Sequence, residues 1–277
     1  MKILCCCNSS YSFTGSELYF YELCETLYDL GYEVTLGTNK ISEVFKQKCF
    51  KFKVILLNEI KESFDLIIMS HSIFTFANIV NIINDTPIIN IIHSEIYDAE
   101  MPLVHNNVVK YIGVRESICE KYKNLKPHIE CIYNPIDLNK FNTLGVSKEP
   151  IGLFVGTPDS TRYKAMKHFS YYCKYNNLLS VNISGDERKS SLFDVTLNQI
   201  EEVEIYFKKC SISGGILKGR TYFEAKLCGK PVIEYFLDEK FSIYDIKYED
   251  PVIDEKEFHK MQNQLDKYSV AKKILKF

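Results

Sequence analysis

Short apolar runs alternate with amphipathic stretches throughout the first half of the chain. Continuous apolar runs predict strands at residues 2–7, 33–37, 52–57, 65–69, 88–92, 108–114 and 129–133. Apolar residues at helical spacing predict helices between them, at residues 16–30, 41–47, 73–84 and 115–124. Such alternation is typical of a parallel sheet that is covered by helices on both faces. We therefore predict a doubly wound α/β domain.

The pattern restarts after a polar interruption between Phe141 and Pro150. Strands are predicted at residues 151–155, 179–183, 209–213 and 231–235, and helices at 163–175, within 195–207, from about 220 to 227, and at 254–275. Residues 238–250 show no clear pattern. We expect two Rossmann-like domains, at residues 1–147 and 148–277, with packing of the last helix against the first domain as an alternative for that helix.

The most informative stretch runs from Ser213 to Glu234, which we interpret as loop, helix, tight turn and buried strand. A glycine-rich loop before a helix presents unpaired N–H groups that can hold a phosphate. Glu224, one turn inside that helix, offers two acceptor oxygens that suit a vicinal diol such as a ribose. A phosphate next to a vicinal diol is the arrangement found in a nucleotide, so this stretch indicates nucleotide binding. An ordinary βα unit with a surface Glu is the alternative interpretation.

Polar residues also follow several predicted strands, where ligands bind in parallel sheets. In the first half these positions hold Asn8 to Glu17, His71, His93-Ser94-Glu95 and Arg115-Glu116. In the second half, Arg162 and Lys164 stand at a helix start, where two cations can neutralise a diphosphate. The alternative for these two is a solvated basic helix start.

Composition narrows the class of protein. The 277 residues are 46% apolar and 25% charged with a formal charge of −2, which argues against dominant polyanion binding without excluding a local basic patch. The first apolar run is too short for a signal peptide, and no run approaches the length of a membrane span. Ten cysteines, three of them consecutive within a strand, indicate buried thiols in a reducing cytosol, so we expect a cytoplasmic protein. No Walker or Gly-x-Gly-x-x-Gly motif is present.

The stretch Gly219-Arg-Thr-x-x-Glu224-Ala-x-x-x-Gly-Lys-Pro-Val-Ile resembles the donor-site segment of retaining GT-B glycosyltransferases of the family 4-like (glycosyl transferases group 1) type. Further resemblances occur in the family's order: Thr14-Gly-Ser-Glu17, Asp65 to His71, Ile91-Ile-His93, and Tyr133 to Phe141. Four positions depart from the family pattern, and two of them, Thr14 and Pro135, each stand where the family has a glycine. Ile216 stands where the family has a first Glu that faces the donor sugar, and Thr157 stands where an Arg is common.

The resemblance implies the GT-B fold, two Rossmann-like domains facing each other across a cleft. The first would bind the acceptor and the second a nucleotide diphosphate sugar, with a UDP-sugar most expected as co-substrate and with neither metal nor cofactor. The implied catalytic residues are His93, Arg162 and Lys164. The donor-binding residues would be Gly15, Ser16, Thr157, Gly185, Gly219, Arg220, Thr221 and Glu224, and the acceptor-side candidates are His71, Glu95 and Arg115.

Alternatives remain for the reaction and for the acceptor. Retention of configuration rests on the resemblance alone, and an inverting transferase that uses His93 as general base is the second enzyme hypothesis. A catalytically silent nucleotide-sugar-binding scaffold is the hypothesis favoured by Ile216. The acceptor could be a polysaccharide, a lipid-linked glycan, a protein or modified DNA, and the oligomeric state stays open.

Overall fold

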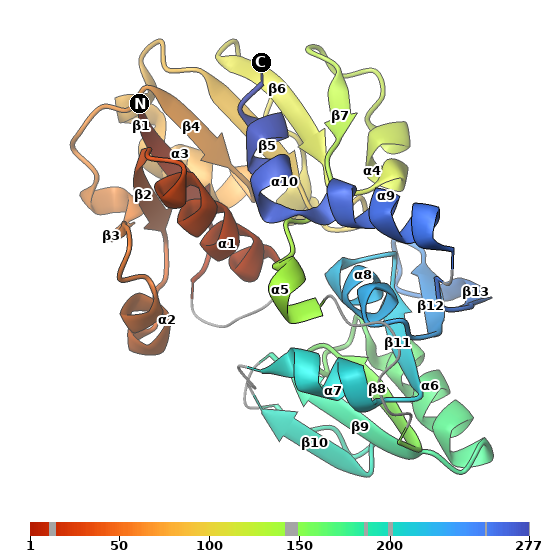
Figure 1. Cartoon of the computed structure of the whole chain (residues 1–277). Helices are drawn as coiled ribbons and strands as arrows, with labels where there is room; N and C mark the ends of the chain where they lie inside the picture. Colours follow the sequence, from red (N-terminus) through yellow and green to blue (C-terminus); the bar gives the residue numbers. More distant parts are fainter. Residues whose placement is uncertain (11–14, 142–148, 186–187, 199–201, 253, 277) are drawn as a thin grey trace. The chain divides into compact units, whose positions relative to one another are not determined.

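The computed structural model describes residues 1–10, 15–141, 149–185, 188–198, 202–252 and 254–276 (Figure 1). The chain divides into two compact units, Met1–Pro135 with Gln264–Phe277, and Ile136–Asn263. The domain boundary expected between residues 147 and 148 falls outside the described residues. The C-terminal segment belongs to the first unit.

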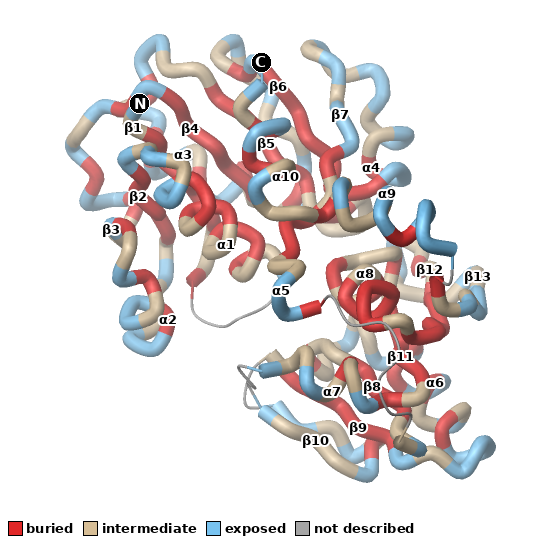
Figure 2. Tube along the Cα trace, in the orientation of Figure 1, coloured by how far each residue is buried: buried red, intermediate tan, exposed pale blue. Residues whose placement is uncertain are grey.

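Within its described residues, the first unit contains a seven-stranded parallel sheet in the order β3-β2-β1-β4-β5-β6-β7. Its strands are mainly apolar, and Figure 2 shows its central strands as buried. The strands are β1 (Lys2–Cys7), β2 (Glu33–Thr38), β3 (Lys53–Leu56), β4 (Leu66–Met69), β5 (Ile88–Ile92), β6 (Val108–Gly113) and β7 (Ile129–Cys131).

Helices cover this sheet. The described α-helices of the first unit are α1 (Gly15–Asp29), α2 (Glu43–Lys48), α3 (Ser72–Ile83), α4 (Glu116–Lys121) and α10 (Lys267–Ile274), with short 3-10 turns η1 (Leu57–Glu59) and η2 (Asp98–Glu100). The last of these helices, α10, packs against α1 and adds Val270, Ala271 and Ile274 to the core of the unit. The C-terminal helix therefore stabilises a domain that begins more than two hundred residues earlier.

The second unit contains a six-stranded sheet, again counted over described residues, in the order β10-β9-β8-β11-β12-β13. Its strands are β8 (Ile151–Val155), β9 (Leu179–Ser184), β10 (Val195–Asn198), β11 (Ile212–Ile216), β12 (Val232–Leu237) and β13 (Ile243–Glu249). All neighbours are parallel except β12 and β13. The helices are α5 (Leu138–Phe141), α6 (Tyr163–Tyr175), α7 (Val203–Lys209), α8 (Arg220–Leu227) and α9 (Glu255–Leu265), the last of which contains the point where the chain passes to the first unit.

In both sheets, the direction in which the chain adds strands reverses beside the first strand. The chain runs from β1 outward to β3 and then returns to β4 on the other side of β1, and it runs from β8 to β10 before it returns to β11. Helices that leave two neighbouring strand ends in opposite directions open a crevice between them, and ligands bind there in open α/β sheets. The expected ligand sites therefore lie at the carboxyl ends of β1 and β4, and of β8 and β11.

The elements differ from the sequence-based expectations at the closing helix, and the structure defines two segments for which the sequence predicted no exact bounds. The helix expected within 195–207 is α7 (Val203–Lys209), and the residues before it form strand β10, because Val195 to Asn198 pair in register with Val181 to Ser184 of β9. The closing helix is interrupted at Asp266, whose side chain caps α10 by accepting the Ser269 N–H. Residues 238–250, which lacked a pattern, contain the antiparallel edge strand β13.

The glycine-rich segment before α8 also differs from the expected open loop. Gly214 and Gly215 lie inside the buried strand β11. A Cβ on Gly214 would lie 2.5 Å from Phe154 Cδ2, and a Cβ on Gly215 would lie 2.2 Å from Glu234 Oε2. These glycines therefore permit close packing, and the turn itself is confined to residues 217–219.

Candidate functional site

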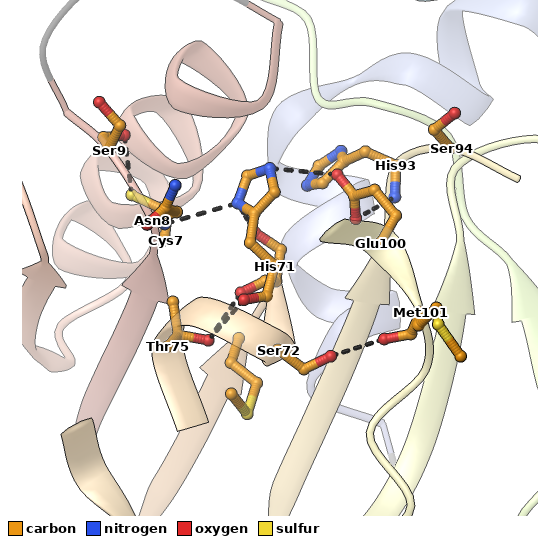
Figure 3. Close-up of polar contacts among 12 residues, drawn as sticks. Cys7, Asn8, Ser9, His71, Ser72, Thr75, His93, Ser94, Glu100 and Met101 are labelled. Atoms are coloured by element: carbon orange, nitrogen blue, oxygen red, sulfur yellow. Dashed lines mark hydrogen bonds and ion pairs between the residues drawn. The ribbon is translucent and has the colours of Figure 1, made fainter. Parts of the chain in front are cut away.

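His71 lies at the crevice of the first unit, where β4 ends and α3 begins. The backbone N–H of Asn8, directly after β1, donates to His71 Nδ1 at 3.5 Å, and Ser70 Oγ lies 3.0 Å from the same nitrogen (Figure 3). Because Nδ1 accepts the amide hydrogen, the ring proton belongs on Nε2. His71 Nε2 lies 3.1 Å from Glu100 Oε1, to which it donates.

Glu100 was not foreseen from the sequence. It lies in η2, its side chain is 6% exposed, and its Oε2 accepts the backbone N–H of His93 at 3.1 Å (Figure 3). Burial alone would raise the pKa of Glu100, but the hydrogen bond from His71 and the two nearby imidazoles lower it below its usual value. A buried carboxylate thus joins the ends of β4 and β5. No local pattern marked it, because its partners lie on other strands.

The His93 imidazole packs among rings. Its centroid lies 4.8 Å from that of Tyr19 in an edge-on arrangement and 6.0 Å from that of His71 in a stacked one. Its Nε2 is buried and has no hydrogen-bond partner among the described residues. Burial lowers the pKa of His93 to about 4, although the Glu100 carboxylate opposes this. The ring is therefore neutral at pH 7 and is a weak base.

Glu95 and Arg115 form a separate pair beyond β5 and β6. Arg115 donates to Glu95 Oε2 through Nε, at 3.0 Å, and through Nη2, while Ser117 Oγ donates to Oε1 at 2.8 Å. Burial raises the pKa of Glu95, but the Arg115 charge and these hydrogen bonds outweigh it and lower that pKa. The fold thus brings all three acceptor-side candidates to one edge of the sheet, although Glu95 and Arg115 bind each other and not His71.

In the second unit, the donor-site candidates follow three neighbouring strands. Gly185 follows β9, Thr157 follows β8 and is buried, and Gly219 to Thr221 begin α8 after β11. Arg220 Nε donates to Glu224 Oε1 at 2.6 Å, with side chains only 7% and 3% exposed. The Arg220–Glu224 ion pair therefore lies beside the crevice between β8 and β11. This holds the Glu224 carboxylate in a defined orientation.

The two cations expected at a diphosphate have other partners. The Arg162 guanidinium forms an ion pair with Asp159, whose Oδ1 accepts the N–H groups of Thr161 and Arg162, each at 3.0 Å. Lys164 is exposed, and its Nζ donates to Ser242 Oγ at 2.8 Å. Asp159 thus holds the turn of residues 160–162 that leads into α6, at the place expected for phosphate. Its residue type, shortly before a helix, was a turn signal that the sequence interpretation did not use.

The remaining candidates are placed as follows. Gly15 is exposed at the start of α1, with open space where a Cβ would point, and Ser16 is half-buried; Thr14 of the same motif lies outside the described residues. Ile216 ends β11, half-buried. Beside it, the fully buried Glu234 of β12 accepts the Lys218 N–H. A carboxylate that the sequence motif did not indicate therefore stands next to the Ile216 position.

Three further features concern ligands and environment. In the described ranges, no group of three or more His, Cys, Asp or Glu side chains could hold a metal ion. No helix within those same ranges has the length and apolarity to cross a bilayer. All ten cysteines are free thiols, eight of them buried.

Comparisons with known proteins find a match in the fold but not in the sequence. No protein-family model matches the sequence, and no curated protein matches it. Among solved structures, a glycosyltransferase from Rickettsia africae matches with a TM-score of 0.65 at 12% identity over 99% of this chain and 98% of its own. AviGT4, a glycosyltransferase involved in avilamycin A biosynthesis, matches with 0.62 at 12% identity over 99% and 96%. An α-glucosyltransferase in complex with UDP and a 13-mer DNA containing an HMU base matches with 0.56 at 12% identity over 99% and 94%. The chain therefore has the two-sheet fold of these GT-B enzymes.

Proposed function

We propose that this protein is a glycosyltransferase that moves a sugar from a nucleotide diphosphate sugar to an acceptor hydroxyl. The observation that carries the proposal is the Arg220–Glu224 ion pair, buried beside the β8/β11 crevice of a GT-B sheet. A carboxylate fixed in orientation near a helix N-terminus suits a ribose next to a phosphate. Neither the fold alone nor the Arg220–Glu224 ion pair alone indicates nucleotide binding as specifically as the two together.

The donor is held by the second unit in this proposal. Glu224 accepts hydrogen bonds from the ribose hydroxyls, while Arg220 keeps its carboxylate in place. Gly219 precedes α8, and Arg220 and Thr221 present the first N–H groups of that helix to phosphate. Thr157, Gly185 and the cations Arg162 and Lys164 complete the site. UDP is the preferred nucleotide because a structural neighbour binds it. When the diphosphate binds, the Arg162 guanidinium must then either leave Asp159 and pair with phosphate, or contact both.

The chemistry proposed is retaining and independent of metal. The bond between the anomeric carbon and the leaving phosphate oxygen breaks, the acceptor oxygen bonds to that carbon on the same face, and the hydroxyl proton passes to the diphosphate. The cations and the α8 N-terminus stabilise the negative charge that develops on the leaving group. In the first unit, His71, held by Glu100 and Asn8, positions the acceptor.

The base-catalysed inverting alternative is weaker. A general base works best with a pKa near the working pH, whereas the pKa of His93 is lowered to about 4. His93 is therefore assigned to positioning. One observation still supports the catalytically silent scaffold: the Ile216 side chain cannot form a hydrogen bond with the donor sugar.

Donor binding is tested first with UDP, GDP, TDP, CDP and ADP in a thermal-shift assay. A ligand at a hundred times its dissociation constant stabilises by about 2.7 kcal/mol. Glu224→Gln should then weaken UDP and UMP alike by about 10-fold or more, since the ribose is common to both. Arg162→Ala should weaken UDP while leaving UMP nearly unchanged. Glu257→Gln, an exposed Glu on α9, is the matched control.

Three outcomes would contradict parts of the proposal. No binding of any of the five nucleotide diphosphates would exclude a transferase that uses one of them as donor carrier. Unchanged UDP affinity in Glu224→Gln would remove the ribose role. If the protein binds a UDP-sugar tightly but does not hydrolyse it even slowly, the catalytically silent scaffold would be favoured.

A further inference from the structure

Two of the ten cysteines, Cys119 and Cys131, are not buried. Cys119 lies on α4, and Cys131 ends β7, which is the edge strand of the first sheet. Helix α4 packs against β7 at this edge (Figure 1). The two thiols that solvent can reach therefore lie on neighbouring elements of the first unit.

The backbone brings these two side chains together. A Cβ on Gly113 would lie 2.7 Å from Cys119 Sγ, so this sulfur occupies the space that the glycine leaves free on β6. Gly113 pairs in register with Cys131 of the parallel strand β7. Side chains in register on neighbouring parallel strands project from the same face of the sheet, about 5 Å apart. The Cys131 side chain therefore projects beside the Cys119 sulfur.

The two thiols form a hydrogen bond, in which Cys131 is the donor. This hydrogen bond lowers the pKa of Cys119 below its usual value, although burial opposes it, and it raises the pKa of Cys131. The contact therefore favours the thiolate at Cys119. The thiolate is the form of cysteine that peroxides oxidise.

Solvent access distinguishes this pair from a second thiol pair in the same unit. The Cys5 and Cys24 side chains also form a hydrogen bond, but both residues are fully buried. Burial raises the pKa of Cys24 well above its usual value. A buried, protonated thiol is inert to oxidants in solution. Cys5 and Cys24 therefore provide a matched control within the wild-type protein.

We propose that Cys119 and Cys131 are an oxidative modification site that forms a reversible disulfide bond in the presence of a hydroperoxide. The Cys119 thiolate attacks one peroxide oxygen, so that an S–O bond forms, the O–O bond breaks, and the departing oxygen takes up the proton that Cys119 released. The Cys131 sulfur then attacks the sulfur of this sulfenic acid. An S–S bond forms, the S–O bond breaks, and hydroxide leaves with the Cys131 proton as water. The two thiols lose two electrons, and the hydroperoxide is reduced to an alcohol and water.

The disulfide bond would fix α4, which holds Glu95 in place. Arg115 directly precedes α4 and donates to the Glu95 carboxylate. Within the helix, Ser117 donates to the same carboxylate and Lys121 donates to the Glu95 carbonyl. A bond from Cys119 to β7 therefore also restricts the contacts of Glu95. The inference goes beyond the proposed function and does not depend on it, because none of these residues belongs to the donor site.

The test treats the folded full chain with hydrogen peroxide and identifies disulfide-linked peptides by mass spectrometry after digestion without reductant. The peptide that contains Cys119 should become joined to the peptide that contains Cys131, at least about tenfold faster than any link between Cys5 and Cys24. The melting temperature should rise by roughly 5–10 °C, because the bond constrains the unfolded chain, and dithiothreitol should reverse the rise. The amides of α4 should exchange more slowly after oxidation.

Serine variants separate the roles of the two thiols, and serine keeps a hydrogen-bond donor at each position. In Cys131→Ser, the sulfenic acid at Cys119 has no second thiol to react with, so dimedone should trap it and peroxide should leave the melting temperature unchanged. Cys119→Ser should give about tenfold less dimedone adduct on Cys131, because it lacks the favoured thiolate.

Three results would overturn the inference: no link between Cys119 and Cys131 in peroxide, an equally fast link between Cys5 and Cys24, or a dimer linked through Cys131 in place of the internal bond. Equal dimedone labelling of the two serine variants would contradict the assignment of Cys119 as the thiol that attacks the peroxide. Unchanged amide exchange of α4 in the linked protein would contradict the fixing of that helix.

Discussion

His71 and His93 follow neighbouring strands, yet their surroundings give them different chemistry. His71 is held at both nitrogens, by Asn8 and Ser70 on one side and Glu100 on the other. His93 has a buried Nε2 without a hydrogen-bond partner in the described part of the chain, and its neighbours are aromatic. His71 can therefore present a fixed polar edge, whereas His93 is a neutral packed ring.

The titration of His93 predicts acid sensitivity. Its pKa is about 4 in the folded protein and about 6.5 unfolded, so the unfolded chain binds the extra proton between these values. Stability should be intact above about pH 6.5 and fall by up to about 3 kcal/mol as the pH drops to about 4. His93→Gln should remove this part of the loss. Urea unfolding across that pH range measures it.

His259→Gln is the control for this pH experiment, because His259 is exposed on α9. It should leave the pH dependence of the wild type unchanged. An equal pH dependence in His93→Gln and the wild type would mean that His93 is not buried as a neutral ring.

At the level of elements, the β11–α8 connection combines close packing with an unusual backbone. Leu217 and Lys218 both have left-handed φ values, 55° and 47°, which cost non-glycine residues roughly 1–2 kcal/mol each. Glu234 accepts the Lys218 N–H and so stabilises this turn. The turn then aims the first residues of α8 at the crevice. Packing of two strands thus determines where the candidate phosphate site begins.

Substitution of Gly215 should therefore be costly. Gly215→Ala would push a Cβ toward Glu234, and we expect a loss of about 1–3 kcal/mol in the free energy of unfolding together with weaker UDP binding. Gly15→Ala has open space around it and starts a helix, so it should lie within about 0.5 kcal/mol of the wild type or be more stable. Urea unfolding of both variants is the measurement. Equal effects would contradict the close packing of β11 and β12.

The turn before α6 makes a second prediction at this scale. Asp159→Ala removes the hydrogen bonds from the Thr161 and Arg162 N–H groups, so the protein should lose about 1 kcal/mol of stability. It also releases the Arg162 guanidinium and these two N–H groups, so UDP should bind more tightly while UMP is nearly unaffected. Asp159→Asn, which keeps an acceptor oxygen without the charge, should recover most of the stability. Titration calorimetry of UDP that showed weaker binding in Asp159→Ala would exclude Arg162 from the diphosphate.

At the scale of the whole molecule, the chain crosses between its two units twice. It enters the second unit at Ile136 and leaves it at Asn263, after which α10 completes the core of the first. The buried Lys110 of β6 holds α10 by donating to the carbonyls of Lys273 and Lys276, at 2.8 and 3.0 Å. The stability of the first unit therefore depends on the last residues of the chain.

Two perturbations should separate the units in amide hydrogen exchange. Lys110→Met leaves the α10 carbonyls without their charged donor, so the amides of α1 and α10 should exchange faster, by roughly 2–3 kcal/mol of opening free energy. UDP should slow exchange in β11 and α8 and leave α1 unchanged. Lys123→Met, at an exposed surface ion pair, is the control. Protection by UDP that appeared in the first unit alone would contradict the donor assignment.

Local periodicity was sufficient for most elements of this protein. The strands at residues 2–7, 88–92 and 151–155 and the helix at residues 163–175 have the expected bounds, since apolar runs and helical spacing depend on the residues themselves. Parallel topology then implied which loops share an edge, which is why the sequence alone was enough to group His71 with His93. Strands β10 and β13 were missed because they depend on pairing with a distant strand, which the local sequence does not indicate.

The pairing of side chains was decided only by the tertiary structure. Nothing near Glu100 in the sequence indicates His71 as its partner, and nothing near Gly215 indicates that Glu234 fills the space beside it. The exposure of Ile73 and the burial of Thr75 in α3 became visible only in the structure, because both residues are compatible with a core helix. Composition and spacing act over one turn or one strand, whereas hydrogen bonds, burial and pKa shifts depend on residues that folding brings together.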